Sequence, residues 1–157
     1  MSHEVPPQAG NNHPTSIPTG VFKTADGHIN IAAAGDHIYR RFCGALGAPE
    51  LETDERFATS AARQTNRDEL NALIDTYTVH RTSDEWVAAM NEAGVPCGPI
   101  YSIDQTFGDE QVKYLGMTGA VEHATLGTLN VVRQPVNLSR TPSRMRCATP
   151  ECGEHTD

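Results

Sequence analysis

The sequence predicts an α+β fold in which helices are inserted between the hairpins of a small antiparallel sheet. Three observations predict it: an Asp26-Gly27 turn between two short strand-like segments, apolar residues at helical spacing from about position 36 to 93, and a second strand-like pair beyond position 119. The 157 residues suit one compact domain. We expect this domain over residues 20–134, between an extended connector at 1–19 and a C-terminal connector at 135–157.

Proline sets the backbone of the first connector. Four prolines and an Asn-Asn pair exclude a regular helix there and favour extended backbone, because proline has no amide hydrogen to donate. These residues are Pro6, Pro7, Pro14 and Pro18, with Asn11 and Asn12. The segments 20–24 and 28–34 then flank Asp26-Gly27 and predict two antiparallel strands, since glycine takes the positive φ that such a turn needs.

Helical segments are predicted after this hairpin. The first ends at Gly47, and Asp36 stands where a side-chain cap of its N-terminus is expected. Residues 48–65 suit short helical turns, and a firmer helix over 66–77 has Asn66 available as its cap. The apolar face of that helix consists of Leu70, Leu73, Ile74 and Tyr77.

The next helix begins at Thr82, where hydroxyl and carboxylate side chains, including Glu85, suit the free amides and the positive end of the helix dipole. It is expected to stop at Gly94. Residues 95–100 contain two prolines, so we predict a rigid extended crossing rather than a helix.

The last third of the chain again contains both helical and strand-like segments. A short helix is expected over 104–115. The segments 120–122 and 129–133 predict a second strand pair joined by a longer loop at 123–128. Beyond Pro135 the chain is interrupted by prolines and predicts a connector.

Composition narrows the class of partner. Twelve Lys and Arg residues against twenty Asp and Glu residues give a net charge of −8, which repels nucleic acid and anionic membranes. No apolar run is long enough to span a membrane, and the N-terminus lacks the features of a signal peptide, so we expect a cytosolic protein. The low aromatic fraction of 6% favours a domain that packs against a partner surface.

The cysteines are expected to be free thiols in a reducing compartment. They are Cys43, Cys97, Cys147 and Cys152. Cys147 and Cys152 with His155 have the wrong spacing for the Cys pairs of zinc sites, and a fourth ligand is not evident, so no metal is expected.

The residues alone do not predict a self-contained active site. The sequence contains no glycine-rich phosphate loop, nucleophile elbow or helical histidine pair. Asp36 beside His37 fits a helix cap better than an acid–base pair, and the seven histidines are dispersed. The arginines nearest to a cluster fit a solvated or structural role better than phosphate binding. They are Arg133, Arg140, Arg144 and Arg146.

An ordered series of motifs resembles the small domain of the class III CoA-transferases, the group of formyl-CoA transferase, carnitine CoA-transferase and α-methylacyl-CoA racemase. Each motif is weak alone, but their common order is hard to obtain by chance. The motifs are Gly10-Asn11-Asn12-His13-Pro14 with Pro18, Phe22-Lys23-Thr24-Ala25-Asp26-Gly27, Asp54-Glu55-Arg56-Phe57-Ala58-Thr59 with Arg63, Asn66-Arg67 and Glu69-Leu70, Thr82 with Glu85-Trp86, Ala93-Gly94-Val95-Pro96-Cys97-Gly98-Pro99-Ile100, and Gly153-Glu154-His155-Thr156.

The resemblance implies a chemistry that this chain supports only in part. Complete relatives are expected to add a large nucleotide-fold domain, which bears the CoA site and a nucleophilic aspartate, and to form interlocked dimers. The aspartate attacks an acyl-CoA thioester and then passes CoA to an acceptor acid. The resemblance therefore implies a CoA thioester as the substrate of the complete enzyme, no cofactor bound by this chain alone, and no catalytic residue within it.

The resemblance also implies a substrate-covering loop at Ala33, Ala34 and Gly35. Small residues there bring backbone close to the acyl group and exclude water. A simple strand-to-helix turn explains the same residues equally well. Racemase members tend to carry a glutamate at the Gly35 position for proton transfer, so glycine favours the transferase branch over the racemase branch.

Three hypotheses follow for this chain. The first is a fragment or split part of a CoA-transferase that supplies the loop and a dimer surface and is inactive alone. The second is a stand-alone binding or oligomerisation module without enzyme activity. The third is one subunit of a two-gene enzyme whose other polypeptide carries the aspartate. The expected partners are a second copy of the chain or the large-domain polypeptide.

Overall fold

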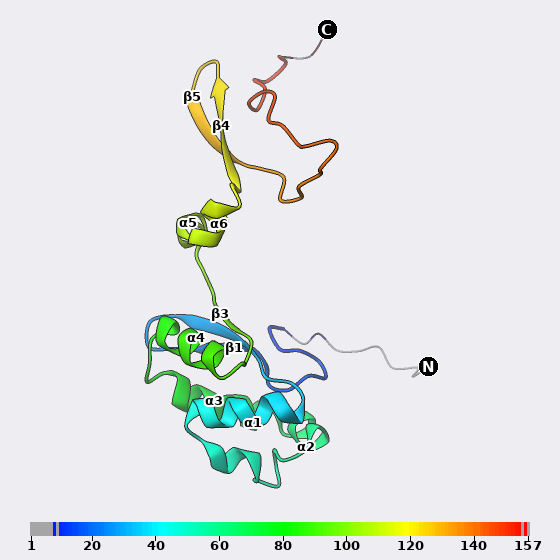
Figure 1. The fold of residues 1–157 in the computed structure, drawn as a ribbon, viewed down its shortest axis with the longest axis vertical. Helices are drawn as coiled ribbons and strands as arrows, with labels where there is room; N and C mark the ends of the chain where they lie inside the picture. The colour runs from blue at the N-terminus through cyan, green and yellow to red at the C-terminus, as the bar shows by residue number, and fades with distance from the viewer. Residues whose placement is uncertain (1–7, 9, 155, 157) are drawn as a thin grey trace, which may run out of the picture. The chain divides into compact units, whose positions relative to one another are not determined.

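The chain divides into two compact units, residues 1–100 and 101–157. The structure, a computed structural model, describes residues 8, 10–154 and 156 (Figure 1). The predicted positions of Pro6, Pro7 and His155 therefore lie outside the described residues. Within the described part, no helix is both long enough and apolar enough to cross a membrane.

The first unit is built on a three-stranded antiparallel sheet, which confirms the predicted α+β class. β1 (Thr19–Lys23) and β2 (His28–Ala32) form the hairpin that the Asp-Gly turn predicted. The extended crossing becomes a third strand, β3 (Cys97–Pro99), which pairs with β2 through Asn30 opposite Gly98. Alternation along the strands buries one face of the sheet, because successive side chains point to opposite sides.

Helices cover that buried face and close the core (Figure 1). Trp86, Phe42, Ile31 and Leu70 are all at most 2% exposed within it. The elements between the hairpin and β3 are α1 (Asp36–Leu46), η1 (Pro49–Glu52), α2 (Ser60–Thr65), α3 (Arg67–Thr78) and α4 (Ser83–Glu92).

Two of the predicted helix ends are confirmed and one is wrong in detail. Gly47 ends α1 in the left-handed region, with φ 82°. Thr82 and Glu85 form a reciprocal capping box at the start of α4. Asn66 does precede α3, but its side chain makes no cap hydrogen bond and instead donates to the carbonyls of Arg56 and Ala62.

The N-terminal segment packs against the hairpin. The amide of His13 donates to the carbonyl of Thr19, and Ile17 is 3% exposed. Gly20 allows close approach at this contact, because a Cβ on Gly20 would lie 2.7 Å from the Asn12 Oδ1 atom. The described end of the predicted connector therefore contributes to the core.

The second unit is smaller and has little interior. Among its described residues Val121 is the one buried apolar side chain. A single short helix was predicted, but the backbone breaks at Asp109, whose carboxylate accepts from the amides of Gln111 and Val112 and starts a second helix. The helices are α5 (Ile103–Gly108) and α6 (Glu110–Tyr114).

The predicted second strand pair is confirmed, with a shorter loop than expected. β4 (Thr118–His123) pairs antiparallel with β5 (Gly127–Val132), so the loop spans 124–126 rather than 123–128. The Nδ1 atom of His123 accepts from the amides of Thr125 and Leu126 and tightens this turn.

Asp26 fastens the hairpin turn to the start of α4. Its Oδ1 atom accepts hydrogen bonds from the Ser83 amide at 2.8 Å, the Ser83 hydroxyl at 3.0 Å and the Thr24 hydroxyl at 3.1 Å. These bonds, the Ser83 amide first, lower the pKa of the Asp26 carboxyl. The sequence predicted Asp26 only as a turn residue. In the structure it also joins the hairpin turn to Ser83, which lies 57 positions further along the chain.

Replacing Asp26 is expected to change the pH dependence of stability. The folded-state pKa of Asp26 is lowered from the ordinary value of 3.8. The stabilisation that its carboxylate provides is therefore present above that value and is lost as pH falls through the folded-state pKa. Urea unfolding should therefore give Asp26→Asn a lower free energy of unfolding than the parent at pH 6. This difference in free energy should shrink below about pH 4. Parallel stability curves from pH 6 to pH 2 would contradict this assignment.

Candidate functional site

The loop between β2 and α1 contains the three predicted covering residues, Ala33, Ala34 and Gly35. Ala33 is fully buried, and its amide donates to the Pro18 carbonyl at 2.8 Å. Ala34 is half-buried and Gly35 is exposed, so the chain passes from the core to the surface within three residues.

Backbone geometry explains the glycine at the outer end of this loop. Gly35 has φ 84° and ψ 141°, a conformation that residues with a Cβ rarely adopt. A Cβ there would meet no atom within 4 Å, so the surrounding space does not demand glycine. The loop consequently presents bare backbone at an open surface.

Asp36 does not have the role that the sequence predicted for it. We predicted an N-cap, but Gly35 occupies the cap position without a side-chain bond and Asp36 is the first residue of α1. The Asp36 Oδ1 atom instead accepts from the Arg63 Nη2 atom at 2.7 Å. A guanidinium from another helix competes successfully for the carboxylate because the bond is charge-assisted.

Arg63 is the residue near the loop whose role sequence reasoning missed. Its side chain is fully buried in α2, and it lies 4.2 Å over the centre of the Tyr39 ring. The sequence gives only a weak signal of this burial. An arginine between the alanines and the threonine of a short helix by itself resembles a surface position.

A shallow groove of about 350 Å³ adjoins the loop on the strands of the first unit. Asn30, Ala32, Pro96, Cys97 and Gly98 line it. Burial raises the pKa of the Cys97 thiol to about 11, so it stays protonated near neutral pH and is a poor nucleophile. The groove is therefore a surface of small residues and backbone rather than a reactive centre.

Four carboxylates whose pKa values are lowered act as hydrogen-bond acceptors within the fold. Each pKa is lowered chiefly by hydrogen bonds from Ser, Thr or Arg. These groups are Asp26, Asp54, Glu85 and Asp104. The described residues also contain no group of three side chains placed to hold a metal ion.

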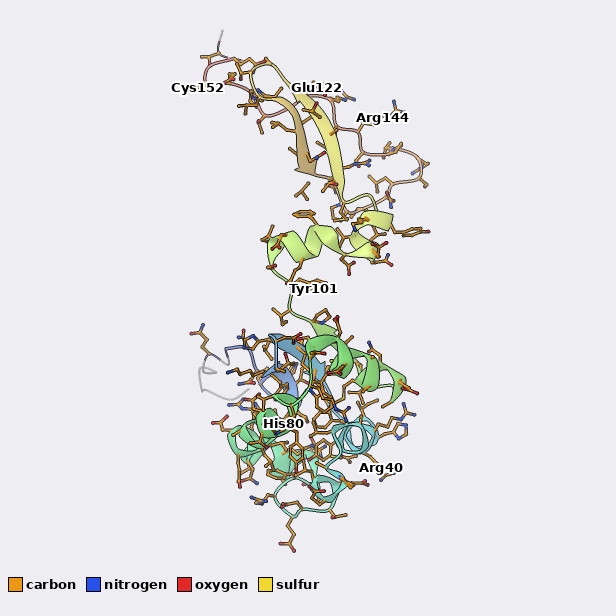
Figure 2. The ribbon with its side chains drawn as sticks, turned by 90° about the vertical axis from the view of Figure 1, so that its left-hand side faces the viewer. Arg40, His80, Tyr101, Glu122, Arg144 and Cys152 are labelled. Atoms are coloured by element: carbon orange, nitrogen blue, oxygen red, sulfur yellow. The ribbon has the colours of Figure 1, made fainter. Side chains whose placement is uncertain are left out.

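The C-terminal arginines lie in different surroundings, and Arg144 and Arg146 line one hollow together with Thr141 and Ser143. The side chain of Arg133 lies along Gly119, where a Cβ would be 2.8 Å from its Cδ atom. Arg146 lines a hollow of about 290 Å³ together with Glu122, Glu151 and Glu154, whose charges oppose phosphate binding. Arg144 and Cys152 project from the segment that follows β5 (Figure 2).

Comparison with known proteins identifies the family to which this loop and fold belong. Residues 1–156 match the family described as CoA-transferase family III. The chain belongs to this family. The predicted resemblance is therefore confirmed, and family III members act on CoA thioesters.

Two relatives to which the chain is similar are CoA-transferases. The chain is 36% identical over 155 residues to a succinate–glutarate CoA-transferase of Agrobacterium fabrum, covering 99% of this chain and 39% of the relative. It is 35% identical over 149 residues to a succinyl-CoA–D-citramalate CoA-transferase of Chloroflexus aurantiacus, covering 94% of this chain and 37% of the relative. The chain thus spans less than two fifths of the length of these relatives.

A solved structure supports the fold. A CaiB/BaiF family protein from Brucella suis matches with a TM-score of 0.83 and 32% sequence identity. The match covers 98% of this chain and 39% of the solved one. The α+β architecture is therefore shared with that protein over the matched region.

The thiols should differ in reactivity according to their environments. Burial raises the pKa of both Cys43 and Cys97 to about 11, whereas Cys147 and Cys152 are exposed. At pH 8 we expect iodoacetamide to modify the two exposed thiols first, because the thiolate is the reacting form and access is open. Peptide mass mapping after timed quenching measures the order. In urea all four should react alike, and rapid native modification of Cys97 would contradict its placement.

Proposed function

We propose that this chain takes part in CoA transfer between an acyl-CoA and a carboxylic acid, and that it supplies the covering loop Ala33-Ala34-Gly35. The observation that carries the proposal is the exposed Gly35, held at positive φ directly after a buried strand, in a chain of CoA-transferase family III. Bare backbone of this kind can approach a thioester without steric conflict and exclude water from a reacting acyl group.

The reacting carboxylate is proposed to come from residues outside this chain. A nucleophilic carboxylate needs a pocket that shields it from water, and the described carboxylates with lowered pKa values serve as acceptors at caps, turns and ion pairs. On this proposal the chain alone does not catalyse transfer and binds no cofactor of its own. Its partner is the aspartate-bearing large domain, a second copy of the chain, or both.

The transferase branch is proposed over the racemase branch. A racemase must move a proton at the carbon next to the thioester and needs a titratable side chain near it. The loop offers none, because its residues are two alanines and a glycine.

Two further proposals concern organisation and location. We propose that residues 20–134 form the family's small domain, with connectors at 1–19 and 135–157, so that the two compact units are parts of one functional module.

We also propose a cytosolic location. The four cysteines of the described residues are free thiols, which is in keeping with a reducing environment.

A chimera tests this function. The matched region of the Agrobacterium succinate–glutarate CoA-transferase would be replaced by this chain, and CoA transfer from succinyl-CoA to glutarate would be followed by chromatography. We expect transfer by the chimera and none by the isolated chain. Gly35→Val in the chimera should lower kcat at least about tenfold, because a β-branched residue is strained at positive φ and displaces the covering backbone.

Ala58→Val provides the matched control, because Ala58 is exposed and lies outside the loop. It should leave transfer unchanged. Turnover by the isolated chain would overturn the proposal that the reacting group lies elsewhere. A folded chimera whose rate is insensitive to Gly35→Val would exclude a covering role for the loop.

A further inference from the structure

The side chain of Arg63 is a buried cation with its hydrogen bonds directed at three separate segments. Its side chain is 0% exposed. The Nε atom donates to the Ile17 carbonyl at 3.1 Å, Nη1 to the Phe57 carbonyl at 2.9 Å, and Nη2 to the Asp36 carboxylate at 2.7 Å. A guanidinium in this position is stable only while these acceptors surround it, because burying an unpaired charge is costly.

Two of these three contacts lie on the two flanks of the loop. Ile17 precedes Pro18, whose carbonyl accepts from the amide of Ala33 at the inner end. Asp36 follows Gly35 directly at the outer end. One planar guanidinium therefore fixes the spacing between the segment before β1, which is bonded to the loop, and the helix that follows the loop.

Tyr39 adds a third restraint from the first turn of α1. Its ring lies under the Arg63 guanidinium, and its amide donates to the Gly35 carbonyl at 2.9 Å. The Tyr39 hydroxyl is anchored in turn on the Leu51 carbonyl at 3.2 Å. The loop itself has only methyl groups and a glycine, so its side chains cannot hold its position and its flanks must do so.

We propose that Arg63 is the positioning residue of the loop 33–35: it holds the covering backbone in place for the acyl group without touching substrate. This inference rests on the proposed function. A covering loop is useful only if its backbone returns to one place, since a displacement of about 1 Å at a reacting centre can reduce the rate about a hundredfold.

Substitutions at Asp36 test whether Arg63 positions the loop 33–35. Its side chain is 74% exposed, so removing the carboxylate breaks one guanidinium contact without opening the core. Asp36→Asn keeps an acceptor oxygen for the Arg63 Nη2 atom and is the conservative variant. Arg40→Ala is the matched control, because Arg40 lies on the same helix and pairs with Glu52 at the surface.

Amide hydrogen exchange of the full chain reports on the loop directly. The reporters are the Ala33 amide, bonded to Pro18, and the Tyr39 amide, bonded to Gly35, while the Val95 amide, bonded to the buried Met90 carbonyl, reports on global opening. We expect Asp36→Ala to speed exchange at Tyr39 about tenfold with Val95 unchanged. Arg63→Lys should speed exchange at both Tyr39 and Ala33, because an ammonium cannot span three acceptors as the planar fork does.

Asp36→Asn should restore most of the protection at Tyr39, and Arg40→Ala should leave it unchanged. Equal acceleration at Tyr39, Ala33 and Val95 would mean that Arg63 stabilises the unit as a whole and would overturn the positioning role. Unchanged loop exchange in both Asp36→Ala and Arg63→Lys would overturn it as well.

The chimera separates this inference from the proposed function. There Asp36→Ala should lower kcat about tenfold and change KM for succinyl-CoA less than twofold, with recovery in Asp36→Asn. A parent chimera that folds but transfers no CoA would defeat the proposed function, whereas the exchange result would still decide whether Arg63 restrains the loop. Active chimeras with equal kcat in parent and Asp36→Ala would defeat the positioning role alone.

Discussion

A buried guanidinium that must have its donors satisfied organises the first unit. Arg63 reaches the segment before β1, the turn before α2 and the first residue of α1, and it lies against an aromatic ring. Losing the contact to either backbone carbonyl would leave a donor without compensation in a dry interior, whereas the Asp36 carboxylate lies largely at the surface. The segment before β1, the turn before α2 and the start of α1 are therefore held at one relative placement. The loop 33–35 is bonded to the first of these through Pro18 and leads directly into the last.

Under the proposed function, this constraint explains how a loop without functional side chains can be held in place beside a reacting group. Ala33 belongs to the core, Gly35 belongs to the surface, and the positive φ of Gly35 turns the chain into α1. The residues around the loop fix its position, while the loop itself contributes backbone with only small side chains. Such a division suits a surface that covers a reacting thioester and leaves covalent steps to a carboxylate elsewhere.

Local rules predicted the elements whose determinants are adjacent in sequence. The Asp26-Gly27 hairpin, the Gly47 stop and the Thr82–Glu85 capping box depend on residues within a few positions of one another. Arg63 could not be assigned in this way, because its partners Asp36 and Ile17 lie 27 and 46 positions away. The same long-range bond explains why the predicted cap role of Asp36 was wrong.

The remaining differences between the predicted and the observed elements also arise from contacts that the local sequence pattern does not show. β3 carries no alternating pattern that would mark a strand, and its register is fixed by hydrogen bonding of the neighbouring Pro96 carbonyl with the Ala32 amide. In the second unit, Asp109 competes as a cap within a segment that otherwise predicted one helix. The loop proposed to cover the substrate was located by the family resemblance, and its conformation became visible only in the fold.

On the proposed function, this chain covers a reaction whose covalent step uses a carboxylate from other residues. Trapping that step in the chimera is the most direct measurement: succinyl-CoA is added, hydroxylamine captures any activated enzyme carboxyl as its hydroxamate, and peptide mass mapping locates it. We expect a hydroxamate only at an aspartate outside the residues contributed by this chain. A hydroxamate on an aspartate or glutamate between positions 10 and 154 would contradict it.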